Sequence, residues 1–217
     1  MTSNIRVLLA DDHTLLRSGI KALLEDEPDI AIVGEAEDGR EAVRLAHTLR
    51  PNLVLMDIAM PLLNGLEATR QIKREHPEIK VLVLTMYDHE EYFRQVLEAG
   101  ASGYIIKRAA ANELVAAIRA VYEGESVLSP AITRYLLEDY LSGETRKDEH
   151  DPNALSPRER EVLQLIAEGN TSREIAEILN LSTKTVQSHR TNLMRKLDLH
   201  DRGDLIKYAI QKKIIEI

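Results

Sequence analysis

Five polar residues that could bind a metal or handle a phosphoryl group follow apolar runs in the first half of the sequence. If these runs are parallel strands, their carboxyl ends meet at one edge of a sheet, where ligands bind in such folds. Several carboxylates at one point repel one another, so a hard divalent cation such as Mg²⁺ is their expected companion. The residues are Asp11 and Asp12 after the first run, Asp57 after the third, Thr85 after the fourth and Lys107 after the fifth.

This combination of side chains favours phosphoryl chemistry. A carboxylate beside a divalent cation can attack phosphorus, while the cation, the Lys107 ammonium and the Thr85 hydroxyl neutralise charge on the transferred oxygens. Taken alone, each aspartate is more simply a helix cap or a solvated loop residue. The placement of all the required residue types at four strand ends favours a site over that simpler interpretation.

The elements that must position these residues are short apolar runs separated by amphipathic stretches. Continuous apolar runs indicate strands that are buried on both faces of a sheet. Between them, apolar residues recur at helical spacing, as in Leu16, Ile20 and Leu23. The pattern predicts a doubly wound α/β fold with a five-stranded parallel sheet. The predicted strands are 5–10, 30–33, 53–56, 81–84 and 104–106.

The second half of the sequence predicts a linker and a small all-α domain. A short helix is expected from Ser129–Pro130 to about Tyr140, and residues 143–152 are charged with nothing to bury. Helix-capping signals then predict helices from Ser156 to Gly169, from Thr171 to Asn180, from Ser182 or Thr183 to about Leu197, and over 204–210. The predicted domains are 1–122, a linker at 123–151, and 152–217.

Charge is distributed unevenly along the 217 residues, whose net charge is −8. Residues 1–122 contain 14 Lys and Arg against 19 Asp and Glu, and residues 123–151 contain 3 against 8. Residues 152–217 carry 11 basic against 9 acidic residues, so only this segment suits a nucleic-acid partner.

Composition limits the other functional classes. There is no cysteine, which excludes disulfides and thiolate metal sites. The first 26 residues hold no apolar run long enough for a signal sequence, and no later segment is long and apolar enough to span a membrane. We therefore expect a cytoplasmic protein with no membrane partner. The seven histidines are scattered without metal-ligand spacing, so no zinc site is expected. Gly65, Gly100 and Gly169 are expected to be turn or C-cap residues.

Residues 4–122 resemble the receiver domain of two-component response regulators, which has a flavodoxin-like fold. The resemblance rests on Asp11-Asp12, the stretch from Met56 to Gly65, Leu84-Thr85, and the stretch from Gly103 to Lys107. It implies that Asp57 is the phosphoacceptor, assisted by Thr85 and Lys107. It also implies that Thr85 and Tyr104 form a switch pair, and that Mg²⁺ is held by Asp11, Asp12, Asp57 and the backbone carbonyl of Ala59.

Two residues depart from the receiver pattern. Met86 stands where many receivers have a smaller residue, and Arg108 stands where many have a proline, which puts in doubt a cis peptide bond after Lys107. The resemblance implies a sensor histidine kinase as partner, facing the first helix around Leu15, Leu16 and Ile20. It implies no enzymatic activity beyond self-phosphorylation from a phosphodonor and slow self-dephosphorylation.

Residues 155–197 resemble the helix-turn-helix of the LuxR/FixJ/NarL type, so the whole chain is similar to a NarL-family response regulator. The resemblance rests on the blocks 155–163, 169–176 and 185–190, followed by Lys196-Leu197. Amides and hydroxyls can read base edges while cations contact phosphates. We expect the third helix to bind double-stranded DNA. The expected base-reading residues are Gln187, Ser188 and Thr191, with Thr185 beside them, and the expected phosphate contacts are Lys184, Arg190, Arg195 and Lys196.

The resemblance further predicts a homodimer of the phosphorylated protein on paired promoter half-sites, able to act on the transcription machinery. Its dimer surface is expected at residues 89–97, at the last helix around Leu205, Ile206 and Ala209, or at both.

Two other functions compete with this interpretation. In a haloacid-dehalogenase-type phosphatase a second acid stands two residues after the nucleophile, whereas Asp57 is followed by Ile58-Ala59. A phosphorylation-independent DNA-binding regulator would keep the first domain only as a dimerisation scaffold. The intact set of Asp57, Thr85 and Lys107 disfavours it.

Overall fold

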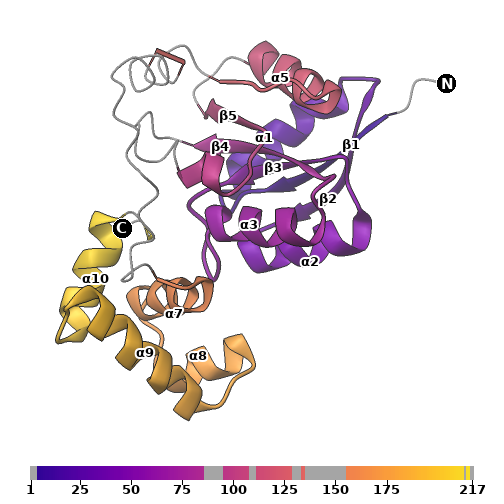
Figure 1. The fold of residues 1–217 in the computed structure, drawn as a ribbon. Helices are drawn as coiled ribbons and strands as arrows, with labels where there is room; N and C mark the ends of the chain where they lie inside the picture. Colours follow the sequence, from indigo (N-terminus) through magenta and orange to yellow (C-terminus); the bar gives the residue numbers. More distant parts are fainter. Residues whose placement is uncertain are drawn as a thin grey trace. The chain divides into compact units, whose positions relative to one another are not determined.

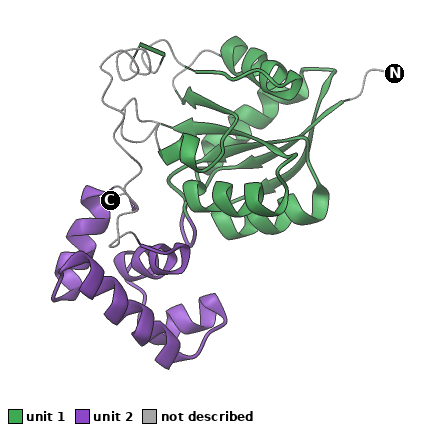
Figure 2. Ribbon diagram, in the orientation of Figure 1, with its two compact units in different colours: residues 1–60, 64–145 green, residues 61–63, 146–217 purple. Residues whose placement is uncertain are grey.

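The computed structural model describes residues 4–85, 95–107, 111–128, 133–134, 155–212 and 214–215. The chain divides into two compact units, residues 1–60 with 64–145 and residues 61–63 with 146–217 (Figure 2). Among the described residues, no helix has the length and apolar character needed to cross a membrane. Met86, Arg108, most of the stretch 89–97 and nearly all of the expected linker helix at 129–140 lie outside the described residues.

The first unit is built on a parallel sheet of five strands in the order β2-β1-β3-β4-β5. Every neighbouring pair is parallel, and the polar residues expected at the site stand at or just after the carboxyl ends of the strands. This confirms the doubly wound topology. The strands are β1 (Ile5–Ala10), β2 (Ile30–Ala36), β3 (Leu53–Asp57), β4 (Lys80–Thr85) and β5 (Gly103–Ile106).

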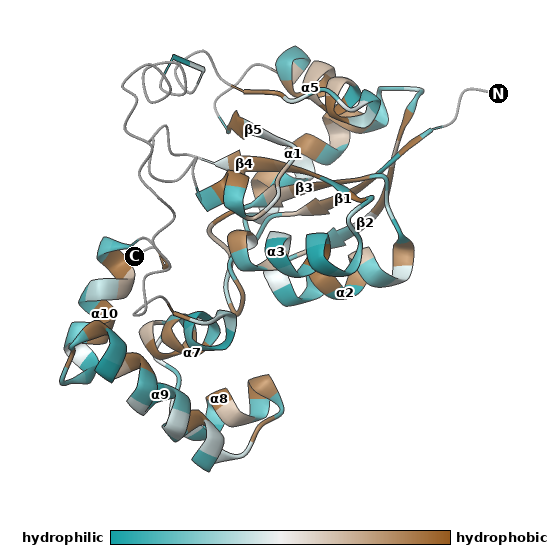
Figure 3. Ribbon diagram, in the orientation of Figure 1, coloured by the Kyte–Doolittle hydropathy of each residue, from teal (hydrophilic) through white to brown (hydrophobic). Residues whose placement is uncertain are grey.

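Helices cover both faces of the sheet (Figure 1). In the central strands, alternate residues such as Leu55 and Leu82 pack toward α1 (Thr14–Glu25) and α5 (Ala111–Glu123). The opposite face meets α2 (Gly39–Leu49) and α3 (Gly65–Glu75). Because both faces are covered, the central strands are apolar along their length, as the hydropathy colouring shows (Figure 3). The core therefore lies in two layers, one on each side of the sheet.

The strand at one edge of the sheet is longer than its apolar run predicts. β2 continues through Gly34 and Glu35 to Ala36, whereas the apolar run ends at Val33. These residues still pair with β1, after a register shift between Val7 and Leu8. Since β2 has a neighbour on one side only, a partly exposed polar residue such as Glu35 is tolerated there.

The second unit is a cluster of four described helices around its own core. The capping boxes expected at Ser156 with Glu159 and at Thr171 with Glu174 are both present, and Ser182 caps the third helix. The fourth begins at Arg202 because the Asp201 side chain caps it, two residues before the expected start. The helices are α7 (Pro157–Ala167), α8 (Ser172–Leu179), α9 (Thr183–Leu197) and α10 (Arg202–Gln211).

Packing in this unit corrects one expectation about dimerisation. Leu205 and Ala209 of α10 are fully buried in the core of the unit, beside Val186 and Leu193 of α9. Their side chains hold α10 against its own domain, so they are not a surface for a second subunit. Of the three residues named there, only Ile206 is partly exposed.

Candidate functional site

The carboxyl ends of the strands bring Asp11, Asp57 and Lys107 into direct contact. The Lys107 Nζ lies 2.7 Å from Asp57 Oδ2 and 2.9 Å from Asp11 Oδ2. The three side chains are almost completely buried, with exposed fractions of 6% for Lys107, 3% for Asp57 and 0% for Asp11. One cation therefore sits against two carboxylates, and the cluster keeps an excess of negative charge.

Asp12 adds a third carboxylate at the same edge. Its Oδ1 lies 2.9 Å from Nδ1 of the exposed His13. One buried oxygen of each aspartate (Asp11 Oδ2, Asp12 Oδ1 and Asp57 Oδ2) has no well-formed hydrogen bond, since the contacts to Lys107 and His13 are close in distance only. Ligand atoms of the three aspartates and His13 all lie within 4.8 Å of one another. A divalent cation satisfies buried carboxylate oxygens that lack well-formed hydrogen bonds, so these residues fit Mg²⁺.

The other expected site residues stand around this cluster. Ala59 lies in the loop directly after β3, and the backbone N–H of Ile58 in that loop donates to Asp57 Oδ1 at 2.8 Å. Thr85 ends β4 and Tyr104 lies in β5, and both side chains are about 1% exposed. The backbone N–H of Lys107 donates to the Thr85 carbonyl at 2.7 Å, which ties the ends of β4 and β5 together.

Burial controls the ionisation of the central carboxyl group. Loss of solvation raises the pKa of Asp57 from 3.8 to about 6, although the Lys107 ammonium opposes the shift. The same burial acts to lower the pKa of Lys107, but the carboxylates of Asp57 and Asp11 outweigh it and raise that pKa. At neutral pH Asp57 is therefore an ionised carboxylate in an environment that disfavours its charge.

Replacing Asp57 by Asn should stabilise the fold in Mg²⁺-free buffer. The folded pKa of about 6 exceeds the ordinary value of 3.8, so stability falls as the pH rises from 3.8 through 6. A shift of about two units, which already includes the opposing effect of Lys107, corresponds to a gain of up to roughly 3 kcal/mol for the uncharged amide at pH 8. Urea denaturation of both proteins at pH 8 and pH 4 measures the difference. A gain in stability that is equal at both pH values would contradict this account. Adding Mg²⁺ at pH 8 should reduce the difference in free energy of unfolding between the variant and the wild type.

Gly65 packs directly against the backbone of the site. A Cβ built there would lie 1.8 Å from the Asp57 carbonyl oxygen, and the Gly65 N–H donates to the Ile58 carbonyl at 2.8 Å. Gly65 is the first residue of α3, after the Asn64 cap, so the expectation that it is a turn or C-cap residue is wrong. Gly100 and Gly169 have φ values of 84° and 100°, as their expected turn and C-cap roles require. At Gly65 the close approach of two backbone segments demands glycine.

Gly65→Ala should destabilise the first unit strongly, because the methyl group meets rigid backbone that cannot turn away. We expect a loss at or above the upper end of the roughly 1–3 kcal/mol typical of overpacking. Gly19→Ala is the matched control, since apart from the backbone of α1 itself no atom lies within 4 Å of its Cβ position. Because alanine favours helix over glycine, this control should gain about 0.5–1 kcal/mol. Denaturant unfolding of both variants tests the contrast, and a small loss for Gly65→Ala would refute it.

In the second unit, α8, a short turn and α9 form a helix-turn-helix. Asn180 ends α8 in a left-handed conformation with φ of 52°, and Val186 and Leu193 bury one side of α9, as expected from their spacing. Ser188 and Thr191 donate their hydroxyls to the carbonyls of Lys184 and Gln187, which leaves the oxygen lone pairs as outward acceptors. Among the residues expected to contact DNA, Thr185 and Arg190 are half-buried. The exposed ones are Lys184, Gln187, Ser188, Thr191 and Arg195.

Lys196 differs from the other expected phosphate contacts. Its Nζ lies 2.7 Å from Oε2 of Glu159, whose side chain is only 5% exposed. The same carboxylate oxygen accepts from the Ser156 N–H in the capping box of α7. Burial acts to raise the pKa of Glu159, but Lys196 and the Ser156 bonds outweigh it and lower that pKa. This geometry makes Lys196 a structural link between α7 and α9.

Two family models match this chain, one over each of its predicted domains. The model described as the response regulator receiver domain matches residues 7–119, and that of bacterial regulatory proteins of the luxR family matches residues 153–209. This chain is a two-component response regulator of the LuxR type. It carries a receiver domain and a LuxR-type DNA-binding domain, as the resemblance of its motifs predicted.

Two named relatives align with nearly the whole length of this response regulator. It is 40% identical to the oxygen regulatory protein NreC of Staphylococcus carnosus (strain TM300) and 41% identical to that of Staphylococcus aureus (strain JH9). Each alignment covers 98% of this chain and 100% of the relative. Proteins of this kind with receiver and DNA-binding domains are generally not enzymes.

Solved response regulators share the fold. The RcsB response regulator of Salmonella typhimurium matches with a TM-score of 0.58 at 31% identity, covering 96% of this chain and 99% of that one. ChrA of a heme-sensing two-component system matches with a TM-score of 0.53 at 34% identity, covering 99% and 100%. RcsB from Salmonella enterica serovar Typhimurium bound to promoter rprA, in the presence of phosphomimetic BeF₃⁻, matches at 0.59 with 31% identity over 95% and 98%.

Sequence reasoning missed one buried cation near the acidic cluster of this response regulator. Arg17 of α1 is 6% exposed, and its Nη1 donates to the Asp11 backbone carbonyl at 2.6 Å. Its Nη2 pairs with Glu37 at 2.6 Å. The guanidinium thus anchors the loop that carries Asp11 and Asp12. The available signal was an arginine one helical turn before Ile20, on the apolar side of a predicted helix.

Proposed function

We propose that phosphorylation of Asp57 by a partner sensor histidine kinase controls sequence-specific DNA binding and transcription by this response regulator. The observation that carries the proposal is the buried Asp57 carboxylate, whose Oδ2 lies 2.7 Å from Lys107 Nζ and has no other hydrogen-bond donor. Such a group is ionised at neutral pH and poorly stabilised, which suits a nucleophile.

In the proposed reaction, an Asp57 carboxylate oxygen forms a bond to phosphorus as the bond between phosphorus and the donor breaks. The donor leaves with the electron pair, and an acyl phosphate remains on Asp57. Lys107 and the hydroxyl of Thr85 stabilise charge on the transferred oxygens. Mg²⁺, when bound by Asp11, Asp12, Asp57 and the Ala59 carbonyl, supplies further charge neutralisation. From a small phosphodonor the same chemistry is self-phosphorylation, and slow hydrolysis of the acyl phosphate is self-dephosphorylation.

Thr85 and Tyr104 are the proposed switch pair. Thr85 adjoins the end of β5, because its carbonyl accepts from the Lys107 N–H. Among the described residues, Tyr104 is one of the largest side chains that are fully buried. When the Thr85 hydroxyl turns toward a new phosphoryl group, it would vacate space behind it. The ring of the buried Tyr104 would fill that space.

The proposed DNA interface is the exposed side of α9. Gln187, Ser188 and Thr191, with Thr185, would read base edges, while Lys184, Arg190 and Arg195 would contact phosphates. Lys196 was also expected to contact phosphate, but its ion pair with Glu159 favours a structural role. Solved neighbours include two RcsB dimers bound to two parallel DNAs. We accordingly propose that the phosphorylated protein binds paired half-sites as a homodimer, in the cytoplasm, where it can act on the transcription machinery.

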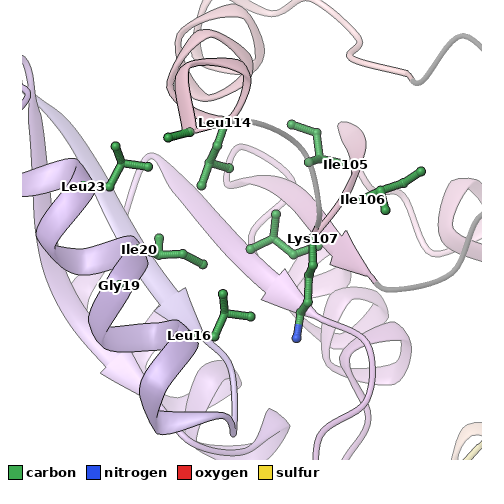
Figure 4. Close-up of a pocket in the computed structure, with 10 residues that line it drawn as sticks. Leu16, Gly19, Ile20, Leu23, Ile105, Ile106, Lys107 and Leu114 are labelled. Atoms are coloured by element: carbon green, nitrogen blue, oxygen red, sulfur yellow. The ribbon is translucent and has the colours of Figure 1, made fainter.

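The kinase would dock on the apolar groove between α1 and α5. A cavity of about 240 Å³ there is lined by Leu16 and Ile20 of α1, Leu114 of α5 and the stem of Lys107 (Figure 4). Leu15 on the same helix is 88% exposed. A docked apolar surface would therefore lie beside Lys107, the residue that contacts Asp57.

We also propose the domain limits 1–122 and 152–217, with 123–151 as a linker. The matches of the two family models to residues 7–119 and 153–209 support these limits.

Phosphorylation should tighten DNA binding. We expect acetyl phosphate with Mg²⁺ to increase the affinity of the wild-type protein for its target DNA at least about tenfold, which corresponds to roughly 1.4 kcal/mol. The affinity of Asp57→Asn should not respond. Fluorescence anisotropy at fixed salt measures both. An unchanged wild-type affinity would instead support the phosphorylation-independent regulator, in which the receiver serves only as a dimerisation scaffold.

A further inference from the structure

A second group of metal-binding side chains lies away from the acidic cluster, at the C-terminal ends of α2 and α3. These helices pack side by side (Figure 1). His47 of α2, Glu75 of α3 and His76 after it each place a ligand atom within 4.8 Å of the others. His76 is 5% exposed, whereas His47 and Glu75 are exposed, so the group is open to solvent on one side.

The two imidazole rings already face each other at a spacing that suits a shared metal. His47 Nδ1 lies 3.1 Å from His76 Nε2, and the ring centroids are 5.2 Å apart. Two nitrogen ligands at about 2.0–2.1 Å from a tetrahedral ion lie roughly 3.3 Å from each other. The N···N distance therefore needs little change, although both rings must tilt so that their lone pairs converge on an ion that lies off the line joining the two nitrogens.

Without a metal, Arg50 fixes the proton of His76. Its Nη1 lies 2.6 Å from His76 Nδ1, and a guanidinium can only donate. His76 Nδ1 is thus the acceptor, and Nε2 carries the proton and donates it to His47 Nδ1. In this arrangement Arg50 competes with a metal, because an ion on Nε2 requires the proton on Nδ1.

Glu78 provides the alternative partner for that proton. Its Oε1 lies 3.9 Å from His76 Nδ1 and 3.3 Å from Arg50 Nη1. When Arg50, which is about half-exposed, turns away, the proton of His76 can move from Nε2 to Nδ1 and be donated to Glu78. A carboxylate behind a metal-bound imidazole fixes its tautomer and increases its basicity. The change transfers a proton within His76 and releases none.

We propose that His47, His76 and Glu75 form a binding site for Zn²⁺, with Glu78 accepting the remaining imidazole proton of His76. Two imidazoles and one carboxylate suit a borderline ion such as Zn²⁺ better than Mg²⁺, which prefers oxygen ligands. The site requires no residue of the phosphorylation cluster, so it is independent of the proposed function. The ion would clamp α2 to α3 at the end of the sheet opposite to Asp57.

Zn²⁺ titration of the full-length protein in excess Mg²⁺ tests the proposal, because Mg²⁺ occupies the oxygen-rich acidic cluster. Isothermal calorimetry should give one Zn²⁺ per chain, with the affinity reduced at least about tenfold in His47→Gln and in His76→Gln. Arg50→Ala should bind Zn²⁺ more tightly than the wild type, since the competitor for His76 Nδ1 is removed. A merely structural role for Arg50 predicts no such gain.

Controls separate this site from other histidines. His200→Gln, an exposed histidine on the second unit, should bind as the wild type does, and His13→Gln tests the acidic cluster. Nitrogen-15 spectra should show Zn²⁺ shifting His47 Nδ1 and His76 Nε2. If Zn²⁺ affinity is lost only in His13→Gln, or is unchanged in both His47→Gln and His76→Gln, the proposal is wrong. His47 is exposed, so its variant remains informative even if His76→Gln fails to fold.

Discussion

Asp57→Asn should reduce the uptake of phosphoryl groups from acetyl phosphate to the background of the assay. The amide keeps the volume of the side chain but has no anionic oxygen to attack phosphorus. Intact-mass spectrometry after incubation with Mg²⁺ should show one phosphoryl group on the wild type and none on the variant.

Two other substitutions sharpen this test. Asp26→Asn, at the exposed end of α1, removes the same charge away from the cluster and should leave uptake unchanged. Asp12→Asn keeps the nucleophile but replaces a charged oxygen ligand with a neutral one, so uptake should require more Mg²⁺. Substantial labelling of Asp57→Asn, or equal Mg²⁺ dependence of Asp12→Asn and the wild type, would show that these roles are wrongly assigned.

The sequence predicted the parts of the fold that depend on short-range pattern. Each strand was visible as an apolar run because both faces of the sheet are covered, and the helices of the second unit were visible from their capping residues. The acidic cluster was also predictable, since parallel topology places successive strand ends at one edge. Contacts that depend on backbone shape were not predictable. No pattern in the sequence predicts that Gly65 lies against the Asp57 carbonyl.

Pairings between distant residues were likewise hidden. His47 and His76 are 29 residues apart, with no metal-ligand motif, and only the packing of α2 on α3 brings them together. Lys196 looked like one more cation on a DNA-binding helix because periodicity places it near an exposed face. Its partner Glu159 lies 37 residues earlier, and the capping role of that glutamate gave no sign that it also required a cation.

The ion pair between Lys196 and Glu159 leads to the second prediction. Lys196→Ala should destabilise the DNA-binding unit. The substitution leaves the carboxylate of Glu159 buried beside Ser156 without its cation. Because one member of the pair is partly exposed, we expect a loss of about 1–3 kcal/mol, below the roughly 3–5 kcal/mol of a fully buried pair. Hydrogen exchange of the α7 and α9 amides in the full-length protein measures this loss locally.

Arg195→Ala is the matched control, because Arg195 is the preceding cation on α9 and is exposed. It should change stability by no more than about 0.5 kcal/mol but make the dependence of log K on log salt shallower by about one unit, as expected for a lost phosphate contact. Lys196→Ala, measured at a temperature where it is folded, should leave that slope nearly unchanged. If Lys196→Ala instead leaves stability unchanged and makes the salt dependence shallower, Lys196 contacts DNA as first expected.

The pH dependence distinguishes a lost ion pair from lost packing. The pKa of Glu159 is lowered from 4.5 in the folded protein, so its stabilising contribution is present above pH 4.5 and is lost as the pH falls through the lowered value. A protonated Glu159 needs no cation, and the penalty of Lys196→Ala should therefore shrink on acidification. Adding Glu159→Gln to Lys196→Ala should recover part of the loss at neutral pH, because the amide keeps a capping oxygen without a buried charge. A penalty that is independent of pH and unaffected by Glu159→Gln would mean that Lys196 acts through its aliphatic stem alone.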